Sequence, residues 1–309
     1  MRYLIIPRIE VRNFNALQTW WLSAPPSPMA LQGFITALKL KTGFVFSRFA
    51  IVHHDWQLQA SRNPRFRGIT YHNHELDEKV SKTVVQEVYL PSQFKGATVI
   101  NKNDLANHSI TSNSLQPTAR GNCELSLVIE IPDDNISLNL EAINDFLWSG
   151  RLRGGEIWRS GPIAIVSDWT EIKNIIRTGF WVKDRKDLTL EYMHRYDIDG
   201  TEAILRAVLD HAPQVSSSPA EDSVVSEEEE EHKASPHPWL SANCVGYKLL
   251  EEPQIRKGSL QSLPHAYCEP LVGLIQYCSV RKQQAAQEAI PFWRYNSHEF
   301  NGSYLVTGD

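Results

Sequence analysis

The sequence contains few cysteines and no long apolar run. Its four cysteines, Cys123, Cys244, Cys268 and Cys278, are at least ten residues apart. This spacing suits neither a zinc knuckle nor a compact disulfide framework and favours a reducing compartment. No apolar stretch approaches the roughly 18 residues that a membrane span needs, and the N-terminus has no small-residue cleavage site of a secretory signal. These absences predict a cytoplasmic protein without a membrane segment.

The motifs of common enzyme classes are also missing. The chain has no Gly-x-Ser-x-Gly elbow, no phosphate loop ending in Gly-Lys-Ser/Thr and no dinucleotide fingerprint. His54 and Asp55 are metal-ligand types, but they lie in a predicted strand, where neighbouring side chains point to opposite faces. His72 and His74 can share one strand face, yet no third ligand is evident nearby. We therefore predict a protein that is not an enzyme and needs neither metal nor cofactor.

The net charge of −5 conceals a mildly basic protein. Seven of the 36 acidic residues, Glu221, Asp222 and Glu227 to Glu231, form one tract that contains no base. The remaining 29 acidic residues face 31 basic ones. The rest of the chain therefore permits a polyanionic partner without requiring one.

The acidic tract divides the chain. Its Ser- and Glu-rich composition cannot bury a core, so residues 216–236 are predicted to be a flexible linker. Residues 1–215 precede the linker, and a C-terminal segment of residues 237–309, predicted to pack on the core, follows it. Hydrophobic residues make up 42% of the chain, as is usual for globular domains.

Alternating and helical hydrophobic patterns predict an α+β fold. Strands are expected at Tyr3–Val11, Phe46–Ala60, Cys123–Ile131 and Gly161–Val166, and helices after Ser27 and at Asn139–Trp148. Pro7 places the first strand at a sheet edge or marks a bulge. The order strand, helix, strand, strand, helix, strand is typical of ferredoxin-like and RNA-recognition-motif folds. The long insertion of residues 61–122 separates the second and third strands.

Two segments have the composition of nucleic-acid contacts. The first opens the insertion and contains Arg62, Arg65, Phe66 and Arg67. Arginine forks match phosphate oxygens, and an exposed phenylalanine can stack on a base. The second segment runs from Arg151 to Ile157, and its two glycines allow a backbone to approach a phosphate closely. For each, the alternative is a solvated loop.

Several patches resemble the Csy-two family, the Cas-five-type subunit of the type I-F CRISPR surveillance complex. They include Leu4 to Ala16, Pro26 to Leu38, Arg151 to Ile157, Thr178 to Val182 and, after the acidic tract, Val245 to Tyr247 and Glu269 to Leu274. The resemblance spans nearly the whole chain, and its first patch is the most specific. Residues 61–122 depart from it, because this segment is longer than the family usually shows.

The resemblance implies a non-catalytic subunit with an RNA-recognition-like core and an inserted thumb. Such a subunit binds the 5′ handle of the CRISPR guide RNA, contacts other Cascade subunits and meets target DNA only through the complex. The residues expected to bind RNA are Arg12, Asn13, Asn15, Arg62, Arg65, Phe66, Arg67, Arg151, Arg153, Gly154, Gly155 and Arg159.

Three alternatives stay open. In a reduced variant complex the protein would instead be the repeating, Cas-seven-type backbone subunit that coats the spacer. An endoribonuclease of the same superfamily would need a histidine near the Gly-rich loop, and residues 151–159 contain none. A protein-interaction scaffold would use the nine tryptophans and the acidic tract rather than RNA.

Overall fold

The computed structural model describes residues 2–19, 22–73, 78–91, 119–132, 138–211, 237–256, 263–296 and 302–309, with the backbone alone for residues 60–73 and 78–91. The strands are β1 (Arg2–Asn15), β2 (Phe49–Asn73), β3 (Glu78–Pro91), β4 (Arg120–Ile131), β5 (Arg151–Leu152), β6 (Gly155–Arg159), β7 (Ala164–Val166), β8 (Phe180–Asp184), β9 (Leu240–Leu249), β10 (Gln254–Ile255), β11 (Pro264–His265), β12 (Cys268–Ser279), β13 (Trp293–Asn296) and β14 (Ser303–Gly308). The helices are α1 (Pro28–Thr42), α2 (Leu140–Ser149), α3 (Trp169–Ile175), α4 (Lys186–Tyr196), α5 (Gly200–Asp210) and α6 (Val280–Ala286).

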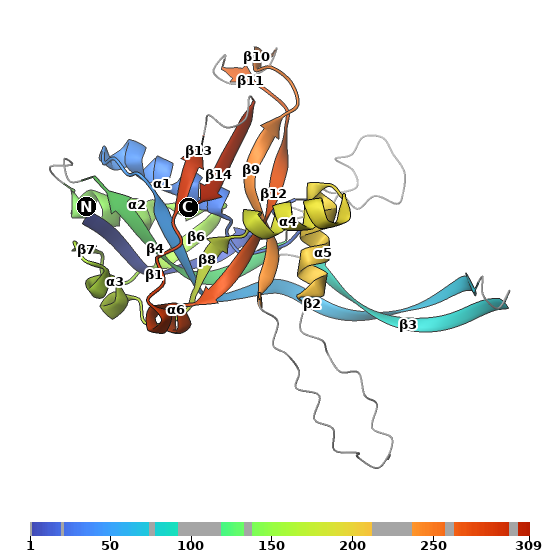
Figure 1. The fold of residues 1–309 in the computed structure, drawn as a ribbon. Coiled ribbons are helices and arrows are strands. Elements are labelled where there is room, and N and C mark those ends of the chain that lie inside the picture. Colours follow the sequence, from blue (N-terminus) through green and yellow to red (C-terminus); the bar gives the residue numbers. More distant parts are fainter. Residues whose placement is uncertain are drawn as a thin grey trace, which may run out of the picture.

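One large antiparallel sheet organises the described part of the chain (Figure 1). Its strand order is β13-β14-β9-β12-β8-β2-β4-β1-β6-β5, with β7 beside β1. The outer half of β2 leaves this sheet and pairs with β3 to form a hairpin that extends away from the body in Figure 1. The chain is therefore a mixed α/β protein built on an antiparallel sheet.

Helices cover the two faces of the sheet unequally. Alternate residues of β1, such as Leu4 and Ile6, face the helices α1 and α2 and are fully buried. Ile5 points to the opposite face, where it packs near Ile172 of α3 and Val280 of α6. This alternation follows from the two-residue period of a strand. On this second face α3 and α6 cover one part of the sheet, and α4 and α5 pack on β9 and β12. The described helices leave the part between them uncovered.

The helix α1 begins where the sequence indicates. The hydroxyl of Ser27 accepts a hydrogen bond from the backbone N–H of Ala30, and Pro28 occupies the first turn. Gly43 ends the helix in the left-handed conformation, with φ of 76°. The predicted apolar face, which includes Leu31 and Leu38, is buried. The sequence prediction of this helix is confirmed.

Pro7 marks a bulge within a central strand. The pairing register of β1 with β4 shifts between Ile6 and Ile9, and Arg8 adopts a positive φ of 53°. The alternative position at a sheet edge is wrong, because β4 pairs along one side of β1 and β6 and β7 pair along the other. The carbonyl oxygen of Pro7 accepts a hydrogen bond from the N–H of Gly161.

Other predicted elements need correction. The second strand continues to Asn73, well beyond the expected end at Ala60. The last predicted strand is shorter than Gly161–Val166, and β6 is a second strand beside β1 that the sequence interpretation treated as a loop. A bulged strand that begins at the second of two successive glycines has no clean alternation, which is why periodicity missed it.

The segment after the acidic tract completes the same sheet. The strands β9, β12 and β14 extend it beyond β8, and β13 returns to β2 through the pair Trp293 and Phe49. The indole N–H of Trp293, which is fully buried, donates a hydrogen bond of 2.7 Å to the carbonyl oxygen of Val182 in β8. The acidic tract itself lies outside the described residues.

Candidate nucleic-acid interface

The uncovered part of the sheet carries polar side chains from four adjacent strands. We call it the open sheet face, on the side away from α1 and α2. Its residues are Arg8, Glu10 and Arg12 on β1, Arg120, Asn122 and Glu124 on β4, Asp55, Gln57 and Gln59 on β2, and Glu156, Trp158 and Arg159 on β6. Each alternates with an inward residue that is buried in the core, such as Val11, Cys123 or Ile157. The open sheet face thus belongs to strands whose other side is buried in the hydrophobic core.

Ion pairs order the arginines on this face. Glu10 accepts a hydrogen bond of 2.9 Å from Nε of Arg12. Its second carboxylate oxygen forms an ion pair with Nε of Arg159 at 2.6 Å. Chiefly because of the hydrogen bond from Arg12, the pKa of Glu10 lies below its ordinary value. Arg8 pairs with Glu124 at 2.9 Å. The register adds two further acids, Glu156 opposite Arg12 and Asp55 opposite Glu124, so four arginines and four acids lie on these strands. Arg151, opposite Glu156 on the adjoining strand β5, supplies one more cation.

Amides form a network at the end of β1. Asn13 adopts a left-handed φ of 57°, and its backbone N–H donates to the side chain of Asn122 at 3.0 Å. The Gln59 amide donates to the side-chain oxygens of both Asn13 and Asn122. Arg120 donates to the carbonyl oxygen of Asn13. Asn15, the next predicted site residue, accepts a hydrogen bond from the N–H of Leu17.

The glycines of the Arg151-to-Ile157 motif shape a tight hairpin. β5 and β6 are joined by Arg153 and Gly154, which both have positive φ, 50° and 74°. Two successive positive φ values define a type I′ turn, for which glycine is suited. At Gly155, an added Cβ would lie 2.6 Å from Cα of Phe14. Both glycines thus serve the fold, by permitting the turn and the close approach of β6 to β1.

Arg153 holds a segment of backbone rather than facing solvent. Its Nε donates to the carbonyl oxygen of Asn15 at 2.8 Å, and its Nη atoms donate to the carbonyl oxygen of Leu17 and to the side chain of Gln18. Burial lowers the pKa of this guanidinium. Arg151, two residues earlier, is exposed.

Replacing Arg153 and replacing Arg151 are expected to change the stability of the protein by very different amounts. Arg153→Ala should lower the free energy of unfolding by about 3 kcal/mol, because carbonyl groups in a half-buried segment lose their donors. Arg151→Ala should change it by less than about 0.5 kcal/mol, because the side chain is exposed. Urea unfolding of both variants measures the difference. Equal stabilities would contradict the role assigned to Arg153.

The arginines of the insertion belong to a different part of the molecule. Arg62, Arg65, Phe66 and Arg67 lie in the outer half of β2, where the backbone pairs with β3. Their side chains lie outside the described residues, so their predicted contact with RNA stays a prediction. The hairpin starts beyond Gln59, at the end of the open sheet face where Arg120 pairs with it.

Sequence reasoning missed several residues of this face. Arg8, Arg120 and Trp158 were not among the predicted site residues, although the structure places them beside Arg12 and Arg159. The alternation of Arg8, Glu10 and Arg12 after the bulge was the available signal, since such a pattern predicts one polar strand face. Trp158 had no such signal, because the bulge in β6 hides its register.

His53 and His54 of β2 are largely buried in the fold. Nε2 of His54 lies 2.6 Å from the hydroxyl oxygen of Ser126. Burial lowers the pKa of His53 to about 3 and that of His54 to about 4, so both are neutral near pH 7. Among the described residues, no three His, Cys, Asp or Glu side chains gather as metal ligands. Of the other candidate pair, His72 is described by its backbone alone and His74 lies outside the described residues.

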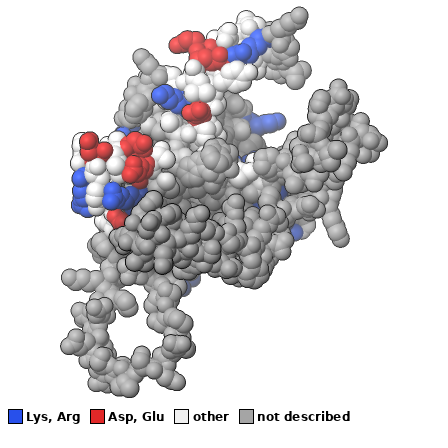
Figure 2. All heavy atoms as spheres, turned by 90° about the vertical axis from the view of Figure 1, so that its right-hand side faces the viewer, with Lys and Arg blue, Asp and Glu red and all other residues white. Residues whose placement is uncertain are grey.

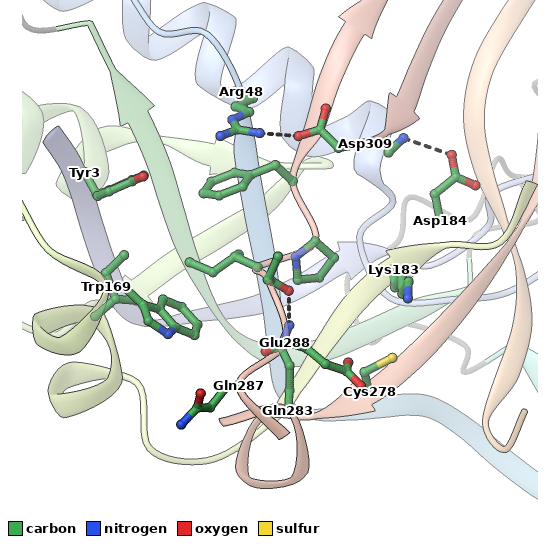
Figure 3. A pocket seen from close by; sticks show the side chains of 16 residues that line it. Tyr3, Arg48, Trp169, Lys183, Asp184, Cys278, Gln283, Gln287, Glu288 and Asp309 are labelled. Atoms are coloured by element: carbon green, nitrogen blue, oxygen red, sulfur yellow. Dashed lines mark hydrogen bonds and ion pairs between the residues drawn. The ribbon is translucent and has the colours of Figure 1, made fainter. Parts of the chain in front are cut away.

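A separate cavity of about 720 Å³ lies between α3, β8, α6 and the C-terminal residues (Figure 3). Its cations are matched by acids. Arg48 pairs with Glu130 and Asp309 while its guanidinium lies 4.4 Å above the ring of Phe292. The cavity is also lined by Asp184 and Glu288. Asp184 accepts a hydrogen bond from the backbone N–H of Gly308. The cavity thus carries charges of both signs.

The side of the molecule that carries α4 and α5 is also mixed in charge. In Figure 2, the described acidic and basic side chains are interspersed rather than segregated. Arg195, for instance, pairs with Glu191 on α4. Interspersed charges of both signs do not attract a polyanion over a distance.

Comparison with known proteins gives one strong result. A family model described as "CRISPR-associated protein (Cas_Csy2)" matches residues 4–306, nearly the entire chain. No curated protein matches the sequence. Among the described residues, no helix is long and apolar enough to cross a membrane.

Proposed function

The chain belongs to the Cas_Csy2 family of CRISPR-associated proteins, and from this premise we propose that it is a non-catalytic RNA-binding subunit of a type I-F-like surveillance complex. It binds the 5′ handle of the guide RNA on the open sheet face. Other Cascade subunits are its protein partners, and it meets target DNA through the assembled complex. The observation that carries the proposal is the face formed by β2, β4, β1 and β6, on which four arginines and several amides lie together.

The strand order supports a ferredoxin-like core. Within the larger sheet, the strands run β2-β4-β1-β6, all antiparallel, while α1 and α2 follow β1 and β4 in the chain. This is the arrangement expected of a split βαβ fold, in which both helices cover one face. RNA-recognition motifs use the opposite face to bind single strands. The open sheet face occupies that position here.

The chemistry of the face suits a folded single strand of RNA. Arg8, Arg12 and Arg159 can donate to phosphate oxygens, since guanidinium groups form paired hydrogen bonds with them. The amides of Asn122 and Gln57 carry both donors and acceptors, which base edges and 2′-hydroxyls require. The β2–β3 hairpin, with Arg62, Arg65, Phe66 and Arg67, is the inserted thumb in this proposal and contacts RNA beyond the handle.

The proposal predicts a strong dependence of RNA binding on salt. Each arginine that neutralises a phosphate of a single strand contributes about 0.7 to the slope of log K against log salt. Arg8→Gln with Arg159→Gln should therefore reduce the slope by about 1.4 and weaken binding about tenfold at physiological salt. Fluorescence anisotropy with a labelled repeat-derived RNA measures both quantities.

The matched control removes two arginines elsewhere. Arg195→Gln with Arg206→Gln changes the net charge equally, but both residues lie on α4 and α5. This control should keep the slope of the parent protein. A control that lowers the slope as much as the double variant would move the RNA-binding surface away from the open sheet face.

The position in the complex needs the assembled particle. The protein should be expressed with its neighbouring genes and a repeat–spacer array, then crosslinked by ultraviolet light to map RNA contacts and copy number. One copy crosslinked at the 5′ handle supports the proposal. Several copies spaced along the spacer would make it the backbone subunit, and cleavage of a repeat hairpin by the purified chain would make it an endoribonuclease. A particle in which it contacts no RNA would make it a scaffold.

A further inference from the structure

A stacked pair of side chains stands at one end of the open sheet face. The guanidinium carbon of Arg12 lies 4.0 Å from the ring centre of Trp158. Arg12 belongs to the central strand β1 and Trp158 to β6, two strands whose register brings them together. We propose that this pair is a stacking site for an unpaired base of single-stranded RNA. The inference rests on the proposed RNA-binding function and assigns a residue that the sequence motifs did not indicate.

A bulge turns Trp158 outward. Along β6, Val11 pairs with Ile157 but Glu10 pairs with Arg159, so Trp158 is the extra residue between them. The neighbouring Ile157 is buried in the core, whereas Trp158 keeps 52% of its surface exposed. Bulges redirect side chains in this way and are common next to functional sites. An indole held open on a rigid strand provides a large flat surface.

The position of Arg12 is fixed before any ligand binds. Its Nε donates a hydrogen bond of 2.9 Å to the carboxylate of Glu10, two residues earlier on the same strand face. Its guanidinium group lies over one side of the indole of Trp158. Its side chain still keeps 42% of its surface exposed. Base stacking on tryptophan and arginine planes is tolerant of sequence, because every base has a π face. A prearranged pair loses little side-chain freedom on binding.

The neighbouring charge suits a nucleotide rather than a free aromatic group. Arg159 follows Trp158 directly, pairs with the second oxygen of Glu10 and keeps 73% of its side chain exposed. A base stacked on Trp158 would therefore bring its phosphate near a cation. Glu10 and Glu156, which lies opposite Arg12 in the register, match the two arginines in formal charge. A phosphate would therefore be bound through the exposed donors of Arg159 rather than through net charge.

Two variants at one position test the stacking site. With a labelled single-stranded RNA, Trp158→Ala should weaken binding about tenfold, and Trp158→Phe should restore most of the affinity. The salt slope should stay unchanged in both, because no charge is removed. Trp148→Ala is the matched control, since Trp148 is 87% exposed but lies on α2, across the sheet. In RNA containing 5-iodouridine, ultraviolet crosslinking should attach the base to Trp158.

The outcomes separate this inference from the proposed function. If the parent binds RNA with a steep salt slope while Trp158→Ala binds equally well, the stacking site is wrong and the RNA-binding function stands. Equal losses in Trp158→Ala and Trp148→Ala would also overturn the stacking site. If the parent shows no salt-dependent binding to any single-stranded RNA, both the stacking site and the proposed function fail.

Discussion

Gly155→Ala is expected to destabilise the protein by about 3 kcal/mol and to remove most of its RNA affinity. An alanine Cβ would lie 2.6 Å from Cα and 2.7 Å from N and Cβ of Phe14. Phe14 is fully buried and its backbone belongs to the central strand β1, so neither side can move without breaking the pairing of β1 with β6. Overpacking of this kind typically costs 1–3 kcal/mol or more. Urea unfolding and RNA anisotropy at one salt concentration measure the two effects.

The loss of RNA affinity follows from the same contact. β6 carries Trp158 and Arg159, and the turn before it carries Arg153, which holds the carbonyl oxygens after β1. When β6 moves away from β1, Trp158 and Arg159 leave the open sheet face together, and Arg153 loses its contacts with the backbone of residues 15–17. Gly33→Ala is the control, because an added Cβ there meets nothing within 4 Å on α1. It should stabilise the protein by up to about 1 kcal/mol through helix propensity. A Gly155→Ala variant as stable as the parent would contradict the packing described here.

The sequence predicts local elements well where hydrophobic periodicity and end signals agree. α1 has both an N-cap at Ser27 and an apolar face, and its predicted start is confirmed by the structure. The strands around Val11 and Leu127 alternate and are found where expected. Periodicity cannot report pairing partners across the chain. The joining of β13 to β2 through Trp293, which depends on residues far apart in sequence, therefore could not be predicted.

The sequence singled out two segments that are neighbours in the structure, but it could not predict the contacts that they make. The end of β1 and the Arg151-to-Ile157 motif do lie together, since β6 pairs with β1. Within this motif, however, Arg153 and Gly155 make contacts inside the protein that the sequence interpretation did not include. A sequence cannot reveal that Arg153 turns back onto the carbonyl oxygen of Asn15, because that contact spans 138 residues. Nor can it separate a glycine that approaches a ligand from one that, like Gly155, approaches a neighbouring strand.

Acid should destabilise this protein well above the pH at which its carboxylates protonate. The pKa of His53 is lowered to about 3 by burial in the folded state, whereas an unfolded histidine titrates near 6.5. Between these values the unfolded chain binds one more proton, so stability falls as pH falls. From pH 7 to pH 5 this residue alone costs about 2 kcal/mol. His54, with a pKa lowered to about 4, adds to the same slope.

His53→Phe isolates this effect. Phenylalanine keeps a ring beside Tyr277 and removes the buried Nδ1, which has no hydrogen-bond partner. Urea unfolding at a series of pH values should show that the variant is at least as stable as the parent at pH 7. Between pH 7 and pH 5 the free energy of unfolding of the variant should fall by about 2 kcal/mol less than that of the parent. His194→Gln, which removes an exposed histidine of α4, should instead follow the parent curve. If His53→Phe also runs parallel to the parent between pH 7 and pH 5, His53 is not held neutral by the fold, because only a folded pKa well below 6.5 produces the difference.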